Sequence, residues 1–182
     1  HKITKFKIVL EPSKRNTAPA ILSTALIQDI PNEQPLIFLS ADQLIEKVSL
    51  FNKAVKKHQK YLTKNNIFIF GIKPSAPSSE FGYFLTKKIK DNINKVSKFI
   101  EKPKESKAKQ IISKKGYWNS GMFFLRKDSI INNFKKYHKI TYQNCYKAII
   151  KAKYKKNVYY LNKQAFNRVT AKSFDYAILE KT

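Results

Sequence analysis

The chain has 182 residues, 42% hydrophobic and 13% aromatic, which is typical of a folded globular protein and excludes a disordered one. No apolar run is long enough to cross a bilayer, and the first residues lack a signal-peptide pattern. The single cysteine, Cys145, excludes an internal disulfide and fits a reducing compartment. We therefore expect a cytoplasmic protein without a membrane partner.

The formal net charge of +25 would suit a nucleic-acid partner on electrostatic grounds. The basic residues are nearly all lysines, however, and they are spread over every segment of the chain. Arginine, which suits bidentate contacts with bases and phosphates, occurs only at positions 15, 126 and 168. We favour a solvated lysine surface and keep a basic nucleic-acid-binding module as the less favoured alternative.

The first predicted strand, over residues 6–10, ends at Glu11-Pro12. After a short loop, Thr17 has the side chain of a helix N-cap ahead of an apolar helix over 20–27. A strand, a loop and a helix N-terminus in this order favour anion binding. Glu11 places a hydrogen-bond-accepting carboxylate at the end of this strand. A solvated loop carboxylate is the alternative.

A second strand is predicted over residues 34–39, and Asp42 follows it directly. An Asp just past a buried strand is a common metal-ligand position in phosphoryl-transfer enzymes. A helix cap is the alternative, because a long amphipathic helix is predicted over 43–59. Its apolar stripe comprises Leu44, Val48, Phe51 and Val55. A third buried strand is predicted over 67–72, before a proline-rich loop.

Two further strands, over 84–88 and 95–100, are predicted to form a hairpin through residues 91–94. The second strand runs into Glu101-Lys102-Pro103, a carboxylate and an ammonium group at a strand end, where ligands of α/β sheets bind. Glu can accept from sugar hydroxyls and Lys can neutralise a phosphate, although a solvated surface pair is the alternative. After a short helix over 108–112, a turn over 116–121 presents Asn119 between glycines, and a strand follows over 122–125.

The rest of the chain is predicted to be mainly helical, over residues 127–138 and 142–153. Near the end, Ser173 suits a helix N-cap and Asp175 lies in the first turn, where the helix dipole stabilises a carboxylate. No linker, repeat or low-complexity segment divides the sequence. We expect residues 1–182 to form a single α/β domain, with helices in three αβα layers around a mainly parallel mixed sheet.

Five motifs, in this order, resemble the mannose-1-phosphate guanylyltransferases, which are nucleotide-sugar pyrophosphorylases. They are EPSKRNTAPA at 11–20, SADQ at 40–43, SEFGY at 79–83, EKP at 101–103 with GYWNSGMF at 116–123, and SFDY at 173–176. The resemblance implies a Rossmann-like nucleotide-diphospho-sugar transferase fold. It also implies the reaction of mannose 1-phosphate with GTP, which gives GDP-mannose and pyrophosphate.

The resemblance also implies roles for individual residues. Asp42, Lys102 and Asp175 would be catalytic, with Asp42 and Asp175 as ligands of Mg²⁺ at the α-phosphate and Lys102 at the sugar phosphate. The nucleotide would be bound by Glu11, Pro12, Arg15 and Asn16. The sugar substrate, or the sugar of GDP-mannose, would be bound by Gly82, Tyr83, Glu101, Lys102 and Asn119.

The chain departs from the family pattern at three places. Gln43 stands where the family has His, and Glu80 stands where it has a glycine, so a left-handed backbone at position 80 would be strained. No glycine-rich, Arg-containing nucleotide loop precedes residues 2–10. We therefore expect an N-terminally truncated catalytic domain with weak or no activity alone, and keep an inactive nucleotide-sugar-binding remnant as an alternative. The sequence leaves the sugar and the oligomeric state open, a homodimer included.

Overall fold

The computed structural model describes residues 5–90 and 93–182, which form two compact units. Unit 1 comprises residues 5–36, 63–66 and 125–181, and unit 2 comprises residues 37–62, 67–90 and 93–124 with Thr182. Each unit is described separately below. The expectation of a single domain over the whole chain stays a prediction.

Unit 1 is built around a buried helix, α1 (Thr17–Ala25), of sequence TAPAILSTA. Six of the nine α1 residues are buried, as expected for a mostly apolar helix in the interior. Helices α4 (Lys127–Tyr137), α5 (Lys139–Ile150) and α7 (Phe174–Ala177) pack against it. The unit is completed by the short helices α6 (Lys163–Phe166) and η2 (Leu179–Lys181).

The cap of α1 differs from the predicted one. Asn16, and not Thr17, is the N-cap residue, because the Asn16 Oδ1 accepts from the Thr17 N–H at 2.8 Å. Asn16 has a φ of 67° and a ψ of −174°, a backbone conformation that is costly for any residue other than glycine. Thr17 is already helical, and its hydroxyl is therefore available to another segment. Its Oγ1 accepts from the Phe174 N–H at 2.9 Å.

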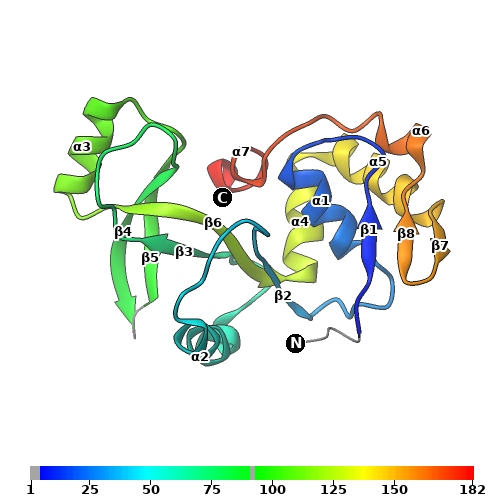
Figure 1. Cartoon of the computed structure of the whole chain (residues 1–182), viewed down its shortest axis with the longest axis horizontal. Helices are drawn as coiled ribbons and strands as arrows, with labels where there is room; N and C mark the ends of the chain where they lie inside the picture. The colour runs from blue at the N-terminus through cyan, green and yellow to red at the C-terminus, as the bar shows by residue number, and fades with distance from the viewer. Residues whose placement is uncertain (1–4, 91–92) are drawn as a thin grey trace. The chain divides into compact units, whose positions relative to one another are not determined.

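A three-stranded sheet also belongs to unit 1, in the order β1 (Ile8–Leu10), β8 (Val158–Tyr160), β7 (Lys153–Lys155) (Figure 1). Strand β1 is parallel to β8, and β7 is antiparallel to it. The predicted helix to residue 153 was therefore wrong at its end. Lys156 and Asn157, with φ of 49° and 66°, form the two-residue turn between β7 and β8, which needs positive φ at both positions.

The second sheet contains β2 (Pro35–Phe38), β6 (Tyr117–Arg126), β4 (Tyr83–Lys90) and β5 (Ile93–Ile100), in that order, and β3 (Phe68–Ile72) pairs with β6. The pairings β3 with β6, β4 with β5, and β4 with β6 are antiparallel. The predicted α/β class with a mixed sheet is confirmed. The antiparallel share is larger than "mainly parallel" suggests, because β4 and β5 pair as a hairpin. Residues 91 and 92 of the predicted turn lie outside the described residues.

Helix α3 (Glu105–Ser113) lies beside β4 in unit 2 (Figure 1). Its Ala108 and Ile111 pack against Tyr83. Helix α2 (Val48–His58) contacts the sheet through Phe51, whose ring lies 5.3 Å from that of Phe70. The predicted start of this helix at residue 43 was wrong, and Leu44 is 86% exposed. The physical reason is a bond that holds Gln43 elsewhere: its Nε2 donates to the Ser120 carbonyl.

The predicted turn over residues 116–121 was also wrong, because β6 begins at Tyr117 and continues through Gly121. The pairing of β6 with β3 continues through this part of the strand, with a register shift between Ile69 and Gly71 of β3. Gly121 has a φ of 71°. Within the described residues, no helix is both long and apolar enough to span a membrane.

Candidate functional site

Three residues predicted to contact the substrate meet on one face of the unit 2 sheet. The Gly82 carbonyl accepts from the Asn119 N–H at 2.7 Å. A Cβ atom added to Gly82 would lie 2.5 Å from the Glu101 Oε2 and 3.5 Å from the Asn119 Cβ. Residues separated by up to 37 positions in the sequence are therefore neighbours. We call Gly82, Glu101 and Asn119 the Gly82 cluster.

The strand register brings the Gly82 cluster together. Tyr83 pairs with Ile100 on one side and with Trp118 on the other. In antiparallel pairs, the residue before Tyr83 therefore lies opposite the residues that follow Ile100 and Trp118. Because side chains alternate between faces, a slip by one residue would move the cluster to the opposite face of the sheet.

Glycine at position 82 is required by space and not by backbone conformation. Gly121 is the described glycine with positive φ, so Gly82 has a backbone that other residues can adopt. The Glu101 carboxylate occupies the space that a side chain at position 82 would need. The Phe99 ring also lies close, 3.3 Å from where a Cβ atom of residue 82 would be. The missing side chain therefore makes room for a carboxylate at the end of β5.

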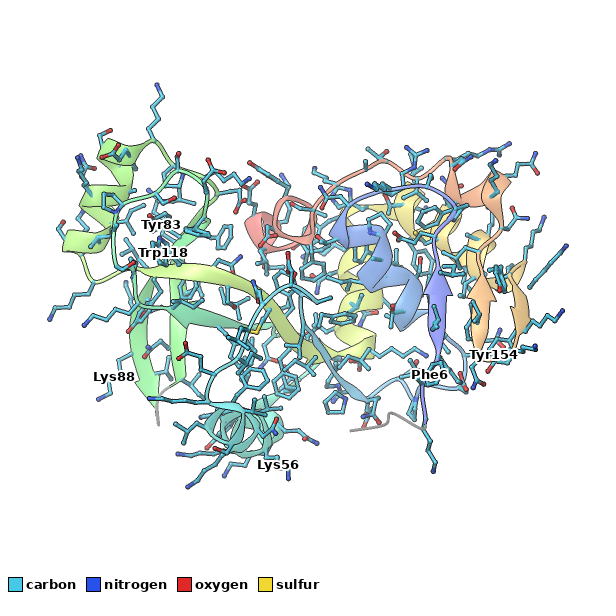
Figure 2. All side chains as sticks on the ribbon, in the orientation of Figure 1. Phe6, Lys56, Tyr83, Lys88, Trp118 and Tyr154 are labelled. Atoms are coloured by element: carbon cyan, nitrogen blue, oxygen red, sulfur yellow. The ribbon has the colours of Figure 1, made fainter. Side chains whose placement is uncertain are left out.

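Tyr83 lies on the opposite face, where its side chain is fully buried. Its hydroxyl donates to the Ser78 carbonyl at 3.0 Å and accepts from the Ser78 N–H at 2.9 Å. The Trp118 ring lies 6.5 Å from the Tyr83 ring, and the two side chains are next to each other in Figure 2. The phenol therefore holds the loop before β4, and Tyr83 can meet a ligand only through its backbone.

Lys102 follows Glu101 directly and has a φ of 40°, in the left-handed region that favours glycine. Such a conformation costs a lysine roughly 1–2 kcal/mol, and residues of this kind concentrate at functional sites. The Lys102 side chain is exposed, while Pro103 after it is buried. The backbone of Lys102 therefore fixes where its exposed side chain leaves the chain, beside the Gly82 cluster.

Glu80 does not have the strained backbone that its place in the family pattern predicts. It is not among the described residues with positive φ. Its N–H donates to the Ser78 Oγ at 3.1 Å and its side chain is exposed. The condition under which strain was expected at position 80, a left-handed backbone, is therefore not met.

The predicted nucleotide residues lie together in the loop of residues 11–16 in unit 1. The Arg15 guanidinium donates to the Asn167 carbonyl at 2.7 Å, and the Ser13 hydroxyl donates to the Asn167 Oδ1 at 2.9 Å. Asn167 holds this loop from more than 150 positions away in the sequence. No local pattern in the sequence could have identified it.

The same loop is joined to the segment that carries Asp175. The Arg15 carbonyl accepts from the Lys172 N–H at 3.2 Å, and the Lys172 carbonyl accepts from the Ala18 N–H at 3.1 Å. The Ser173 Oγ accepts from the Tyr176 N–H at 3.3 Å, which confirms the predicted N-cap. Unit 1 thus brings the nucleotide loop and Asp175 onto adjoining segments.

Glu11 is half-buried, and its Oε1 has no hydrogen-bonding partner within residues 5–90 and 93–182. Burial raises the pKa of this carboxyl group. Burial, and to a smaller extent the charge of Glu11, raises the pKa of the nearby Cys145 thiol to about 12. An ionised Glu11 carboxylate that is partly buried destabilises the folded chain unless a hydrogen-bond donor reaches it.

The two predicted metal ligands belong to different units. Asp42 lies on an exposed turn after β2, in unit 2, and Asp175 is half-buried in the first turn of α7, in unit 1. Their convergence on one metal ion stays a prediction. The described part of the chain has no group of three or more His, Cys, Asp or Glu side chains placed to hold a metal. Two carboxylates nevertheless provide the oxygen ligands that Mg²⁺ prefers.

Comparison with known proteins places this arrangement in a family. The family described as nucleotidyl transferase matches residues 1–167. A mannose-1-phosphate guanylyltransferase of Escherichia coli is 34% identical over 184 residues, which cover 96% of this chain and 40% of that protein. The alginate biosynthesis protein AlgA of Pseudomonas aeruginosa is 31% identical over 180 residues, covering 96% of this chain and 37% of AlgA. The chain thus spans about 40% of the length of these curated relatives.

Solved structures agree with the sequence comparison. A mannose-6-phosphate isomerase from Helicobacter pylori superposes with a TM-score of 0.82 at 29% identity, over 96% of this chain and 68% of that one. A mannose-1-phosphate geranyltransferase from Thermus thermophilus has the same fold, with a TM-score of 0.80 at 22% identity, over 94% and 49% of the two chains. With the family match over most of its length, the chain belongs to the nucleotidyl transferase family.

Proposed function

We propose that the chain acts in GDP-mannose synthesis and carries the sugar-phosphate site and part of the nucleotide site of a mannose-1-phosphate guanylyltransferase. An oxygen of mannose 1-phosphate would attack the α-phosphorus of GTP, and the bond from that phosphorus to the pyrophosphate group would break. The observation that carries the proposal is the Gly82 cluster beside Lys102. The guanylyltransferase relatives support the choice of sugar and base.

The sugar phosphate is assigned to the unit 2 residues by their chemistry. Glu101 accepts hydrogen bonds from hexose hydroxyls, and the Asn119 side chain can both donate and accept. Lys102 provides a positive charge for the phosphate, which its exposed side chain can approach. Gly82 contributes its backbone, since no side chain lies between it and Glu101.

The nucleotide is assigned to residues 11–16 in unit 1. The unpartnered Glu11 Oε1 can accept from the guanine N1–H or 2-amino group, which would compensate for its burial. Arg15 retains a buried Nε without a partner among the residues described. Pro12 and Asn16 shape the loop, because proline fixes one φ angle and Asn16 caps α1.

Asp42 and Asp175 would hold the divalent metal ion of the reaction, which we propose to be Mg²⁺. Bound there, the ion would neutralise negative charge on the α-phosphate during the transfer. The carboxylates supply the ligands, and no general base is required, because the attacking phosphate oxygen is already ionised. The role of the two units is therefore to position groups that are already reactive.

Calorimetric titration with mannose 1-phosphate tests the role of the Gly82 cluster in binding the sugar phosphate. We expect Glu101→Gln to weaken binding about tenfold or more, since a hydrogen bond to a charged group contributes roughly 1.5–3 kcal/mol. The matched control is Glu105→Gln, an exposed α3 carboxylate paired with Lys109. Equal affinity in the Glu101 and Glu105 variants would contradict the assignment.

A turnover assay then separates the enzyme from a binding remnant of the same fold. GDP-mannose formation is measured with GTP, mannose 1-phosphate and Mg²⁺. We expect weak or no turnover by this chain alone, since it spans about 40% of its relatives. Turnover at the rate of a full-length relative would contradict that expectation, while binding without turnover would support the remnant.

A further inference from the structure

A cavity of about 420 Å³ in unit 1 contains none of the residues assigned above to the nucleotide, the sugar or the metal. It lies between the start of α1, the junction of α4 with α5, and the segment around Lys172. Its polar lining includes Lys136, His138, Lys139, Thr141, Thr170 and Lys172. No carboxylate is among its lining residues, so the charge that faces the cavity is positive.

His138 occupies the junction between α4 and α5, with its ring 6.5 Å from that of Phe134. Its Nε2 is buried and has no hydrogen-bonding partner in the described ranges. Burial, and then the charges of Lys172 and Lys181, lowers the pKa of His138, while a hydrogen bond with the Ala177 backbone opposes them. The bond with Ala177 uses the other ring nitrogen, so Nε2 carries a proton only when the imidazole is protonated, and a bound anion would then accept a hydrogen bond from it.

The lysines of the cavity are also uncompensated. Lys7 and Lys109 form ion pairs elsewhere in the chain. Neither Lys139 nor Lys172 forms an ion pair with a carboxylate among the residues that the structure describes. Lys172 is half-buried, so solvent screens its charge less than that of an exposed lysine. Several positive charges around one hollow repel one another, and a bound anion would relieve that repulsion.

We propose that this cavity binds a phosphate ester, with the phosphate group held by Lys139, Lys172 and the Nε2 of His138. The volume lies within the range of small-molecule sites and exceeds what a bare phosphate ion fills. Phe134 and Ile140 provide an apolar wall for the rest of the ligand. This proposal does not rest on the proposed function, because it uses different residues.

Histidine NMR tests the proposal on the full chain, which contains three histidines, at positions 1, 58 and 138. The probe is mannose 1-phosphate, with inorganic phosphate and sodium chloride at equal ionic strength for comparison. We expect a saturable shift of the His138 ring signal, assigned with His138→Gln, and a rise in its pKa. His58, in unit 2 with its Nδ1 against the Ala54 carbonyl, is the internal control and should stay unchanged. Lys136, Lys139, Lys172 and Lys181 are the charged groups that face His138.

Two double variants complete the test. Lys139→Gln with Lys172→Gln should weaken the His138 response roughly tenfold or more, because two charge-assisted hydrogen bonds are lost. Lys135→Gln with Lys147→Gln removes the same charge from residues outside the cavity lining and should leave the response intact. Equal losses in the two double variants, equal shifts of His58 and His138, or equal affinity for inorganic phosphate and the ester would overturn the proposal.

Discussion

The side-chain amide of Gln43 donates to the carbonyl of Ser120 across 2.7 Å, and so joins the turn after β2 to strand β6 in unit 2. Asp42 precedes Gln43, and Asn119 precedes Ser120. The bond therefore couples the turn that carries a proposed metal ligand to the strand that carries a residue of the Gly82 cluster. The donor of this bond, Gln43, stands where the family pattern has a histidine.

Replacing Gln43 tests this coupling. We expect Gln43→Ala to lower the free energy of unfolding by about 1 kcal/mol and to speed amide hydrogen exchange over residues 40–47, because the turn loses its anchor. Gln43→His should recover part of the protection, since an imidazole N–H is also a donor. Gln59→Ala, at the end of α2, is the control. Faster exchange in that variant alone would refute the role of Gln43.

The Gly82 cluster predicts two opposite effects of adding a methyl group. Gly82→Ala should displace the Glu101 carboxylate and weaken mannose 1-phosphate binding at least tenfold, while stability changes little because the displaced atoms end a flexible side chain. Gly116→Ala should lower stability instead, because its Cβ would lie 2.9 Å from the Ile111 carbonyl oxygen and 2.4 Å from the Ile111 Cγ2. Calorimetry and urea unfolding of both variants separate the effects. The reverse pattern would contradict the geometry of the cluster.

The left-handed backbone of Lys102 separates stability from binding. Lys102→Gly should raise the free energy of unfolding by about 1 kcal/mol, because glycine adopts a φ of 40° without a Cβ penalty, and should weaken mannose 1-phosphate binding. Lys115→Gly, at a φ of 56°, should give a similar gain with binding unchanged. Urea unfolding and calorimetry provide the readouts. If binding falls equally in both variants, general loss of charge and not the position of Lys102 is responsible.

Glu11 should oppose stability at neutral pH. Burial raises its pKa above the value of the unfolded chain, so folding favours the protonated form. Its contribution is therefore full below the unfolded pKa of about 4.5 and is lost as the pH rises through the folded value. We expect Glu11→Gln to be more stable than the natural chain at pH 7, with the difference vanishing near pH 4, and to bind GTP more weakly.

Urea unfolding at the two pH values measures the Glu11 effect. Glu180→Gln, an exposed carboxylate at the end of the chain, is the control and should change neither quantity. A Glu11→Gln variant that is less stable at pH 7 would mean that the carboxylate has a stabilising partner, and the guanine assignment would lose its physical basis.

Local patterns in the sequence predicted most of the elements that the structure contains. The strand run before Glu101 and the turn of helix that starts after Ser173 follow from alternation and from capping chemistry, which act over a few residues. The start of α2 and the course of residues 116–121 could not be predicted in the same way. The first involves a bond from Gln43 to the Ser120 carbonyl, 77 positions away, and the second involves pairing of β6 with β3.

The candidate site likewise contains residues that the sequence could identify, while elsewhere in the chain a buried residue gave no signal in the sequence. The resemblance identified Gly82, Glu101 and Asn119, and the strand register explains why those letters belong together. The buried Lys127 had no such signal, although its Nζ donates to the carbonyls of Ile27, at 3.1 Å, and Ile30, at 2.6 Å. In sequence it looks like one of many surface lysines. Only the packing around the end of α1 distinguishes it.

The bonds from residues 172–174 back to residues 15–18 have a consequence for synthesis of the protein. The partners of Arg15, Thr17 and Ala18 leave the ribosome about 155 residues after helix α1 begins. Contacts this distant in sequence form slowly, because a long loop must close first. The nucleotide loop should thus acquire its final shape only after residues 172–174 have been synthesised, and a nascent chain stalled before residue 172 should expose α1 to proteases and chaperones.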